Sequence, residues 1–410
     1  MHVSTRVLLI AATLVLLMTG CSRKDRYVVI ISMDGFRWDL PQMCSTPTLD
    51  SVASVGVFSV VKPVYPSITL PNHYSMATGL WPDHHGIVNN EFYDSVLDTI
   101  FTVRRYDTRS NAALYGGEPI WNTASRQGLL CHVFDWIGVE APVNGKYPAY
   151  SILYDPARTR RELADLVLGS LCQKNVRKIP QLVMWYMDEP DKSEHTYSAE
   201  SEQVREVVED IDSVLGYFFS EVRSSPVYDK IDFIITADHG HTALSPERYL
   251  NLYSAIGPMV ERCDNQTPLG ITPREVCLED VLDSLAVYAP GRYRYWLRDS
   301  LPTEFRFGSF ASRIAPVIIQ PDLGWKIACN PDPDFKRPQP GNSAHGFDPE
   351  ESDMQIAFYG FGPHFKRGYI HDRKFHTADD YLIMCRLLGI DPAPNECSEQ
   401  DIEGLFLNTR

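Results

Sequence analysis

The stretch YVVIISMDG, residues 27–35, decides the fold. Seven apolar or small residues run without a break into an aspartate and a glycine. A strand without alternating polar residues is typical of a sheet that helices cover on both faces. Residues 181–187, 231–237 and 354–361 form three more apolar runs, each nearly unbroken, and residues 204–218 carry apolar side chains at helical spacing. We therefore predict an α/β fold with a central, mostly parallel sheet flanked by helices.

The pattern of the predicted sheet is interrupted once. Residues 251–341 contain several prolines and short aromatic runs such as 293–296, and they lack clear helical periodicity. We predict that they form a smaller inserted lobe. The core of the protein is then made of residues 27–250 and 342–402.

The N-terminus has the pattern of an export signal. Arg6 precedes the apolar segment 7–18, which is too short to span a membrane. The sequence LMTGC that ends at Cys21 resembles a bacterial lipobox. We predict a signal peptide over residues 1–20, a lipid on Cys21 that anchors the exported chain to a bacterial membrane facing the periplasm, and a tether over residues 21–26. The alternatives are an ordinary signal peptide and a retained membrane anchor.

The charge and the cysteine content of the chain narrow the kinds of ligand and metal site that we expect. The formal net charge is −15 and no dense run of Lys and Arg occurs, which argues against a nucleic-acid polymer as the main ligand. Eight cysteines besides Cys21, an even number, permit disulfides in an oxidising compartment. None of them forms a C-x-x-C pair, so a cysteine zinc cluster is not expected. Nothing in the sequence implies a protein partner.

Acidic residues follow three of the predicted strands at the point where each strand ends. They are Asp34, the segment DEPD at 188–191, and Asp238. A single aspartate in such a position is more often a turn residue or a helix cap. In an open α/β sheet, however, ligands bind at the carboxyl ends of the strands, so these carboxylates would share one crevice. Their mutual repulsion predicts bound cations.

Histidines accompany these carboxylates. His195 lies four residues after Asp191, His239 follows Asp238 directly, and His345 stands in the segment NSAHG. Mixed ligation by Asp and His suits zinc. The sequence therefore predicts a zinc site at the edge of the sheet.

Between the first two acidic loops lie PSITLPNHYSMATG at 66–79 and WPDHHGIVNN at 81–90. Together with MDGFR at 33–37, EPD at 189–191 with its histidine, DHG at 238–240 and HG at 345–346, these motifs follow one another in a characteristic order. The chain thereby resembles the nucleotide pyrophosphatase/phosphodiesterase family of the alkaline phosphatase superfamily. The resemblance implies an alkaline phosphatase-like sheet and hydrolysis of phosphate diesters.

Carried over motif by motif, the resemblance implies two zinc ions per chain. One would be held by Asp191, His195 and His345. The other would be held by Asp34, Asp238 and His239, and would also bind Thr69. Zinc would lower the pKa of the Thr69 hydroxyl so that it attacks phosphorus and forms a phospho-threonine intermediate. Asn90 would donate its amide to a non-bridging oxygen.

The substrate is the least determined prediction. Nucleotide enzymes of this family commonly have a Phe directly after the nucleophile to stack the base, and here that residue is Leu70. Tyr154 would supply the other face of the pocket. We expect cleavage of nucleotide phosphodiesters and pyrophosphates to a 5′-nucleotide. The alternatives are a glycerophosphodiester or phospholipid head-group phosphodiesterase, and a phosphoethanolamine-type transferase that uses the same site.

Overall fold

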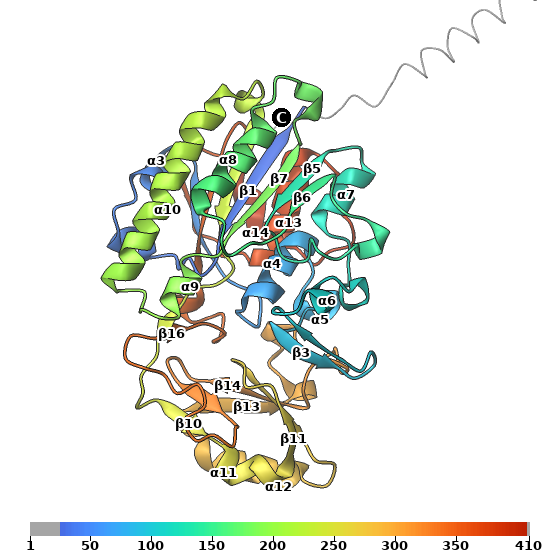
Figure 1. Cartoon of the computed structure of the whole chain (residues 1–410), viewed down its shortest axis with the longest axis vertical. Helices are drawn as coiled ribbons and strands as arrows, with labels where there is room; N and C mark the ends of the chain where they lie inside the picture. The colour runs from blue at the N-terminus through green and yellow to red at the C-terminus, as the bar shows by residue number, and fades with distance from the viewer. Residues whose placement is uncertain (1–24, 408–410) are drawn as a thin grey trace, which may run out of the picture.

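An eight-stranded sheet forms the centre of the structure, a computed structural model that describes residues 25–407 (Figure 1). The predicted signal peptide and Cys21 lie outside these residues. The strand order is β18-β2-β17-β8-β1-β7-β5-β6. The strands are β1 (Tyr27–Met33), β2 (Val57–Val61), β5 (Cys131–Phe134), β6 (Tyr150–Ile152), β7 (Leu182–Met187), β8 (Ile231–Thr236), β17 (Ile356–Phe361) and β18 (Tyr369–His371).

The predicted α/β fold is confirmed. The four apolar runs of the sequence form the four adjacent strands β17, β8, β1 and β7. Every residue of β1, β7 and β8 is buried. Only β17 runs antiparallel to its neighbours, and the other pairings in this sheet are parallel. The sheet is therefore mostly parallel, as predicted.

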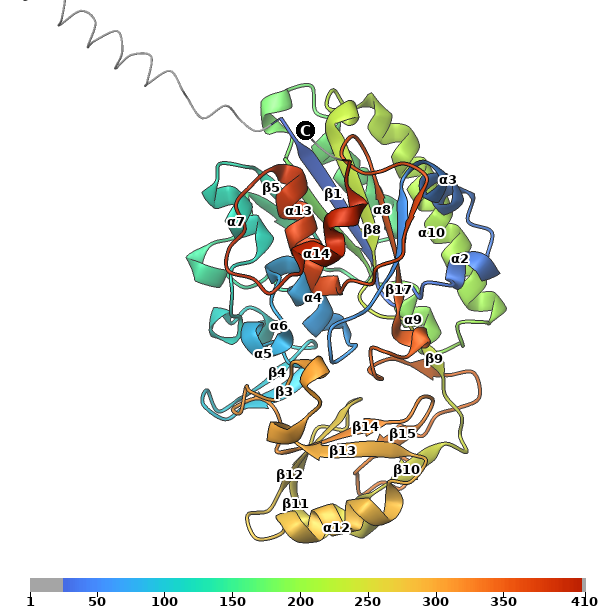
Figure 2. The same cartoon turned by 180° about the vertical axis from the view of Figure 1, so that it is seen from behind.

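Helices cover both faces of the sheet. One face carries α3 (Pro47–Val55), α8 (Arg160–Leu171) and α10 (Glu202–Glu221), which lie together in Figure 1. The other carries α4 (Thr69–Thr78), α7 (Ile120–Arg126) and α13 (Asp380–Leu388), seen from behind in Figure 2. The helix α10 contains the predicted apolar spacing, and Ser201 caps it by accepting from the Val204 N–H.

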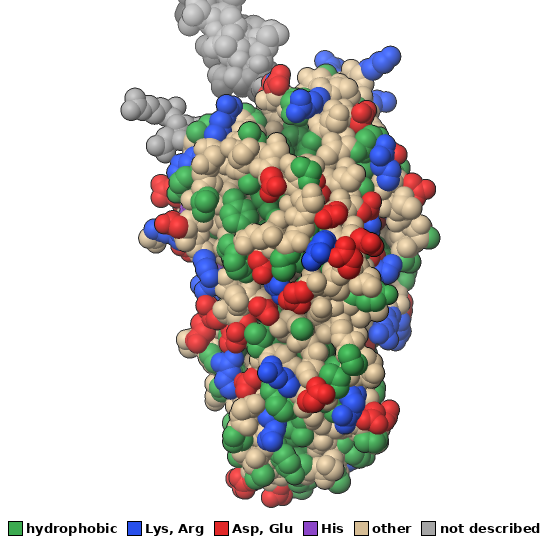
Figure 3. Space-filling model, turned by 90° about the vertical axis from the view of Figure 1, so that its left-hand side faces the viewer, with side chains coloured by type: hydrophobic (Ala, Val, Ile, Leu, Met, Phe, Trp, Pro, Cys, Tyr) green, Lys and Arg blue, Asp and Glu red, His purple; other side chains and the backbone are tan. Residues whose placement is uncertain are grey.

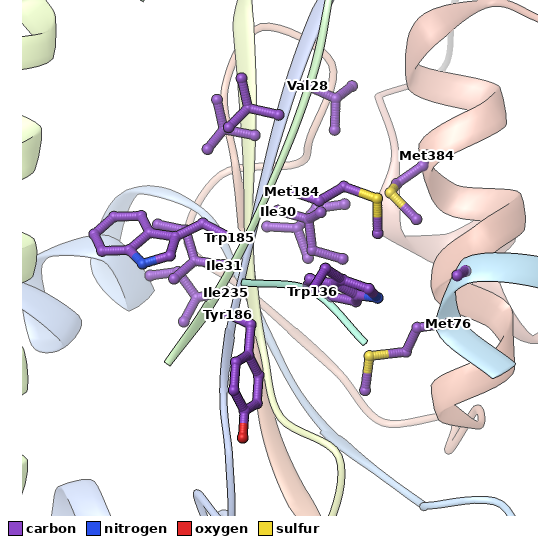
Figure 4. Packing of buried hydrophobic residues seen from close by; sticks show 14 of the residues in the cluster. Val28, Ile30, Ile31, Met76, Trp136, Met184, Trp185, Tyr186, Ile235 and Met384 are labelled. Carbon is purple, nitrogen blue, oxygen red and sulfur yellow. The ribbon is translucent and has the colours of Figure 1, made fainter. Parts of the chain in front are cut away.

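The alternation of side chains along the strands builds a core on both faces. In Figure 4, Trp185 points to one side of the sheet and Met184 to the other, toward Met384 of α13 and Met76 of α4. The ring of Tyr186 extends from the same strand with its hydroxyl outermost. The sheet thus places a polar group at the end of an otherwise apolar strand.

A second, smaller sheet lies below the first in Figures 1 and 2 and has its own apolar core. Its strand order is β11-β12-β14-β13. The elements of this region are β10 (Tyr249–Asn251), α11 (Tyr253–Ile256), β11 (Val260–Cys263), β12 (Leu269–Pro273), α12 (Leu278–Tyr288), β13 (Tyr293–Leu297), β14 (Val317–Pro321) and β15 (Lys326–Ala328). The sequence of residues 251–341 shows no clear helical periodicity, but the region contains α12, which buries Val281 and Leu285 one turn apart.

The remaining α-helices and strands are short. They are α2 (Leu40–Met43), α5 (Pro82–His85), α6 (Tyr106–Arg109), α9 (Asp191–Glu194), α14 (Glu399–Ile402), β3 (Glu91–Asp94), β4 (Thr99–Thr102), β9 (Thr242–Ala243) and β16 (Ser343–Ala344). Two of them, α9 and β16, each lead directly into a histidine of the candidate site.

Three further features of the structure bear on the sequence predictions. The eight cysteines between residues 25 and 407 are all free thiols, so the structure forms none of the disulfides that their number permitted. In the same part of the chain, no helix has the length and apolarity needed to cross a bilayer. On the face shown in Figure 3, basic side chains are interspersed with acidic and apolar ones.

Candidate active site

The loops that follow β1, β7 and β8 meet at one edge of the sheet. The Asp34 N–H donates to the Met187 carbonyl at 2.9 Å, and the Asp191 N–H donates to the Asp34 carbonyl at 2.9 Å. Gly35 has a φ of +79°, and a Cβ on it would lie 2.9 Å from the Asp191 Cα. The glycine after the first aspartate therefore lets the two acidic loops touch.

The first ligand group consists of Asp34, Asp238 and His239, all buried. The His239 Nε2 lies 3.5 Å from Asp34 Oδ1 and 3.1 Å from Asp238 Oδ2. The outer oxygens have partners: Tyr186 donates to Asp34 Oδ2 at 2.6 Å, and the Gly35 N–H donates to Asp238 Oδ1 at 3.1 Å. The inner oxygens, Asp34 Oδ1 and Asp238 Oδ2, have no hydrogen-bond partner among the described residues.

The second ligand group contains Asp191, His195 and His345. The single turn of α9 places His195 on the same side as Asp191, with Nε2 3.5 Å from Asp191 Oδ1. His345 arrives from a distant part of the chain, because β16 pairs with β9 directly after the 238–241 loop. Its Nε2 lies 3.6 Å from Asp191 Oδ1, and its ring stacks on His239 at 3.8 Å.

The electrostatics of the first ligand group fit a divalent cation. Burial, aided by the nearby Asp191, raises the pKa of Asp238 to about 7. Burial raises the pKa of Asp34 well above its ordinary value, again aided by neighbouring carboxylates. Carboxylates in such a place need compensation by positive charge. Because the free oxygens and the imidazole Nε2 atoms converge, the donor set suits zinc.

Thr69 is the first residue of α4 and is 8% exposed. Its Oγ1 lies 3.2 Å from the His239 Nε2. The residue at the cap position is Ile68, so the Thr69 hydroxyl is not used to cap the helix. Asn72 holds the preceding loop, since its Nδ2 donates to the Pro66 and Ile68 carbonyls at 3.0 Å each. The hydroxyl is thus fixed beside the first ligand group.

The three predicted substrate residues line one pocket with Thr69. The pocket has a volume of about 530 Å³ and contains Leu70, Asn90 and Tyr154. The Asn90 Oδ1 accepts from the Leu70 N–H at 2.9 Å. The Tyr154 hydroxyl donates to Asp188 Oδ2 at 2.8 Å. The structure therefore brings together every predicted site residue except Cys21, which lies outside the described residues.

Sequence reasoning missed several residues of this region. His241 is buried within the second ligand group, and its only sequence signal is its position two residues after His239. Tyr186 precedes the second acidic loop and had been assigned only to a buried strand. Arg109 and Glu140 line the pocket 3.6 Å apart, and neither stands in a motif.

Known proteins share this architecture. The chain matches the family model described as type I phosphodiesterase / nucleotide pyrophosphatase over residues 28–348. It is 31% identical over 389 residues to the bis(5′-adenosyl)-triphosphatase of Bos taurus, a match that covers 92% of this chain and 83% of that protein. It is 30% identical over 392 residues to ectonucleotide pyrophosphatase/phosphodiesterase family member 1 of Homo sapiens. This second match covers 93% of this chain but 42% of that protein.

A solved structure gives the same result. Murine ectonucleotide pyrophosphatase/phosphodiesterase 5, in an inactive form with a threonine replaced by alanine and in complex with AMP, has a TM-score of 0.86 to this chain at 25% identity. The match covers 93% of this chain and all of that one. The predicted family is confirmed: this chain belongs to the type I phosphodiesterase / nucleotide pyrophosphatase family.

Proposed function

We propose that the protein hydrolyses nucleotide phosphodiester and pyrophosphate bonds with two zinc ions and Thr69 as the nucleophile, and releases a 5′-nucleotide. The observation that carries this proposal is the position of the Thr69 Oγ1, 3.2 Å from the His239 Nε2 and open to the 530 Å³ pocket. One ligand group is Asp34, Asp238 and His239, and the other includes Asp191, His195 and His345.

The chain's own residues divide the reaction into two steps. The Thr69 Oγ1 gives up its proton and attacks phosphorus, the bond to the leaving oxygen breaks, and a nucleotidyl ester of Thr69 forms; water then attacks the same phosphorus, frees Thr69 and releases the 5′-nucleotide. Asn90 is held by Leu70 so that its Nδ2 is available to a phosphate oxygen. Zinc, when bound, supplies the positive charge that lowers the pKa of the hydroxyl and stabilises the leaving oxygen.

The pocket beyond Thr69 supports a nucleotide substrate. Leu70 and Tyr154 give it apolar and aromatic walls. The Arg109–Glu140 pair adds donors and acceptors, and the Arg109 Nε has no partner among the described residues. A mostly apolar cleft with a few polar groups is typical of a small-molecule site. Burial raises the pKa of the Glu140 carboxyl, and the neighbouring Arg109 opposes this shift.

Two relatives support the same reading. One is named a bis(5′-adenosyl)-triphosphatase, and the other was solved in complex with AMP as an inactive threonine-to-alanine variant. Leu70 favours the second candidate, a glycerophosphodiester or head-group phosphodiesterase, because it offers no ring for base stacking. A transferase with a phosphoethanolamine-type donor would use the same Thr69 but would pass the phosphoryl group to an alcohol instead of water.

The test offers three chromogenic substrates in parallel to the zinc-loaded protein: thymidine 5′-p-nitrophenyl phosphate, p-nitrophenyl phosphorylcholine and p-nitrophenyl phosphate. We expect the highest kcat/KM for the thymidine ester, with thymidine 5′-phosphate as product. Preference for the phosphorylcholine ester would support the head-group candidate. Dominant monoester cleavage would contradict both, and transfer to added ethanolamine in place of hydrolysis would identify a transferase.

We also propose that the chain is exported and carries a lipid on Cys21, facing the periplasm. The support is the segment LMTGC directly after an apolar stretch of signal length. The test is metabolic labelling with a radioactive fatty acid in cells that express the full chain or Cys21→Ser. Label and membrane association should both depend on Cys21; equal labelling of the two chains would refute the proposal.

A further inference from the structure

His241 lies deeper in the second ligand group than the predicted ligands. It is fully buried, while the His195 side chain is 48% exposed. The ring centroid of His241 is 4.9 Å from that of His195 and 5.1 Å from that of His345. Its Nε2 lies 2.7 Å from Asp191 Oδ1. Three imidazoles therefore surround one carboxylate.

The hydrogen bonds around Ser343 determine which ring nitrogen of His241 carries a proton. The single hydroxyl proton of Ser343 goes to the Glu194 carbonyl at 2.5 Å. The Ser343 Oγ must then accept from the His241 Nδ1–H, 3.0 Å away. In the neutral ring this leaves a lone pair on Nε2, which faces a carboxylate oxygen that can only accept. Two acceptors at this separation need a positive charge between them, which either a second ring proton or a bound cation supplies.

The same orientation recurs at two other histidines of the site. The His239 Nδ1 donates to the Gly240 carbonyl at 3.3 Å, and the His345 Nδ1 donates to the Ser67 carbonyl at 3.2 Å. Each ring thereby turns Nε2 inward. A second hydrogen bond of this kind is the usual way to orient a metal-binding histidine. His241 thus shares its orientation with two residues that the family resemblance assigns as ligands.

The Glu194 carboxylate is a second feature that points to a bound cation. Its side chain is fully buried, and neither carboxylate oxygen has a hydrogen-bond partner among the described residues. The inner oxygens of the first ligand group have the same property. The Glu194 Oε2 lies 3.7 Å from the His241 Nε2. The nearby Arg37 bonds to Asp39 and to the His241 carbonyl. A buried carboxylate without a partner is strongly unfavourable unless a cation lies close by.

We propose that His241 is a fourth protein ligand of the metal held by Asp191, His195 and His345, and that Glu194 supplies the second negative charge of this site. The carboxylates of Asp191 and Glu194 together carry two negative charges, which balance the charge of a divalent cation. This proposal rests on the two-metal site proposed above. It assigns the second metal a more enclosed site than three ligands would give.

The test uses the cobalt-loaded full chain and proton NMR in water. Each imidazole bound to paramagnetic cobalt that keeps its other ring N–H gives an exchangeable resonance far outside the normal range. We expect His241→Asn to lose one such resonance and to retain the others. The same variant should also lower the binding affinity for one of the two metal ions by more than about 100-fold. This loss exceeds the roughly 10–100-fold loss that is typical of removing a residue that only orients a ligand.

Matched variants separate the possible outcomes. His132 also bonds through Nδ1 to a serine, the Ser170 Oγ at 2.9 Å, but it lies on β5 outside both ligand groups, so His132→Asn should match the wild type. Glu194→Gln should lower the binding affinity for the same metal ion without removing a resonance. His241→Gln is the second variant if the Asn form does not fold.

Each result has one interpretation. An unchanged set of resonances in both His241 variants would mean a protonated ring that only hydrogen bonds to Asp191, and would overturn the ligand assignment. Unchanged affinity in Glu194→Gln would overturn the charge assignment. If the wild-type chain bound no metal, the two-metal function itself would fail, which distinguishes the two proposals.

Discussion

The Oδ1 of Asn90 accepts a hydrogen bond from the Leu70 N–H at 2.9 Å. Leu70 follows Thr69 directly, near the start of α4, where backbone N–H groups have no partner within the helix. The bond therefore ties the loop that carries Asn90 to the start of α4, next to Thr69. It also uses the acceptor half of the amide, which leaves the donor half for the substrate.

Asn90→Ala tests the donor role. We expect kcat to fall by roughly 10²–10³, the usual effect of losing one oxyanion donor, with zinc content unchanged. Asn90→Asp is the informative control, because it keeps an acceptor for the Leu70 N–H but replaces the donor with a negative charge. Steady-state kinetics with the thymidine ester would measure both. If the Asp variant kept the wild-type kcat, Asn90 would be only a positioning residue.

Thr69→Ala tests the nucleophile. We expect kcat to fall by several orders of magnitude, while bound zinc stays near two per chain, because all six other predicted ligands remain. Thr69→Ser keeps a hydroxyl at the same place and should retain part of the activity. Acid quenching of the wild-type reaction with labelled substrate should trap the labelled nucleotidyl group on Thr69. Turnover in the Ala variant at the wild-type rate would refute the role of Thr69.

The centre of the fold was predictable because both faces of the central strands are buried. Nearly unbroken apolar runs at 27–33 and 231–237 identify such strands without any alignment. The outer strands were missed for a physical reason. In β2, Phe58 and Val60 are partly exposed, and β6 has only three residues, so neither shows a long apolar run. Short strands near the margin of a sheet depend on their neighbours more than on their own sequence.

The site was predictable in part. Asp34 and Asp238 end buried strands, so a general rule about sheets brought them together. His345 could be added only through the resemblance, since the β9–β16 pair that delivers it is two residues long. His241 and Glu194 were missed because nothing in the linear sequence shows that a side chain is buried without a partner.

Acid should destabilise the protein through buried neutral histidines. His85 is fully buried between Ser75 and the Ile87 N–H, and burial lowers its pKa from 6.5 to about 3. The unfolded chain takes up the proton as the pH falls below 6.5 and the folded chain does not, so stability is lost between these values. From pH 7 to 5 we expect a loss of about 2 kcal/mol from this residue.

The measurement is urea unfolding at pH 7 and pH 5. His85→Gln should show a smaller loss of stability over this interval than the wild type, although it starts from lower stability. The adjacent His84 is exposed and pairs with Glu396, so His84→Gln is the matched control and should keep the wild-type pH dependence. An unchanged pH dependence in His85→Gln would rule out this source of acid sensitivity.

Removal of zinc should lower the thermal stability. Asp34, Asp238 and Glu194 would then retain buried carboxylate oxygens without partners. A ligand present at a thousand times its Kd stabilises the folded state by about 4 kcal/mol. We expect chelation to lower Tm by several degrees and added zinc to restore it. Thr69→Ala keeps all the carboxylates and should show the same shift. A Tm that did not respond to chelation would argue against both metal sites.

Tyr154 separates the two candidate substrates. Its ring forms a wall of the pocket, meets Tyr186 edge-on at 6.3 Å, and is fixed by the hydrogen bond to Asp188. If the ring stacks on a base, its removal should forfeit about 1–3 kcal/mol of binding. Tyr154→Ala should therefore raise KM for the thymidine ester by roughly fivefold or more.

Tyr154→Phe keeps the ring and loses only the hydroxyl, so it should stay close to the wild type with the thymidine ester. The phosphorylcholine ester provides the comparison, because choline has no aromatic face to stack. If Tyr154→Ala raised KM equally for both esters, the ring would serve the architecture of the pocket and not base recognition. If it affected the choline ester more, a cation–π contact with the quaternary ammonium would explain the result and favour the head-group substrate.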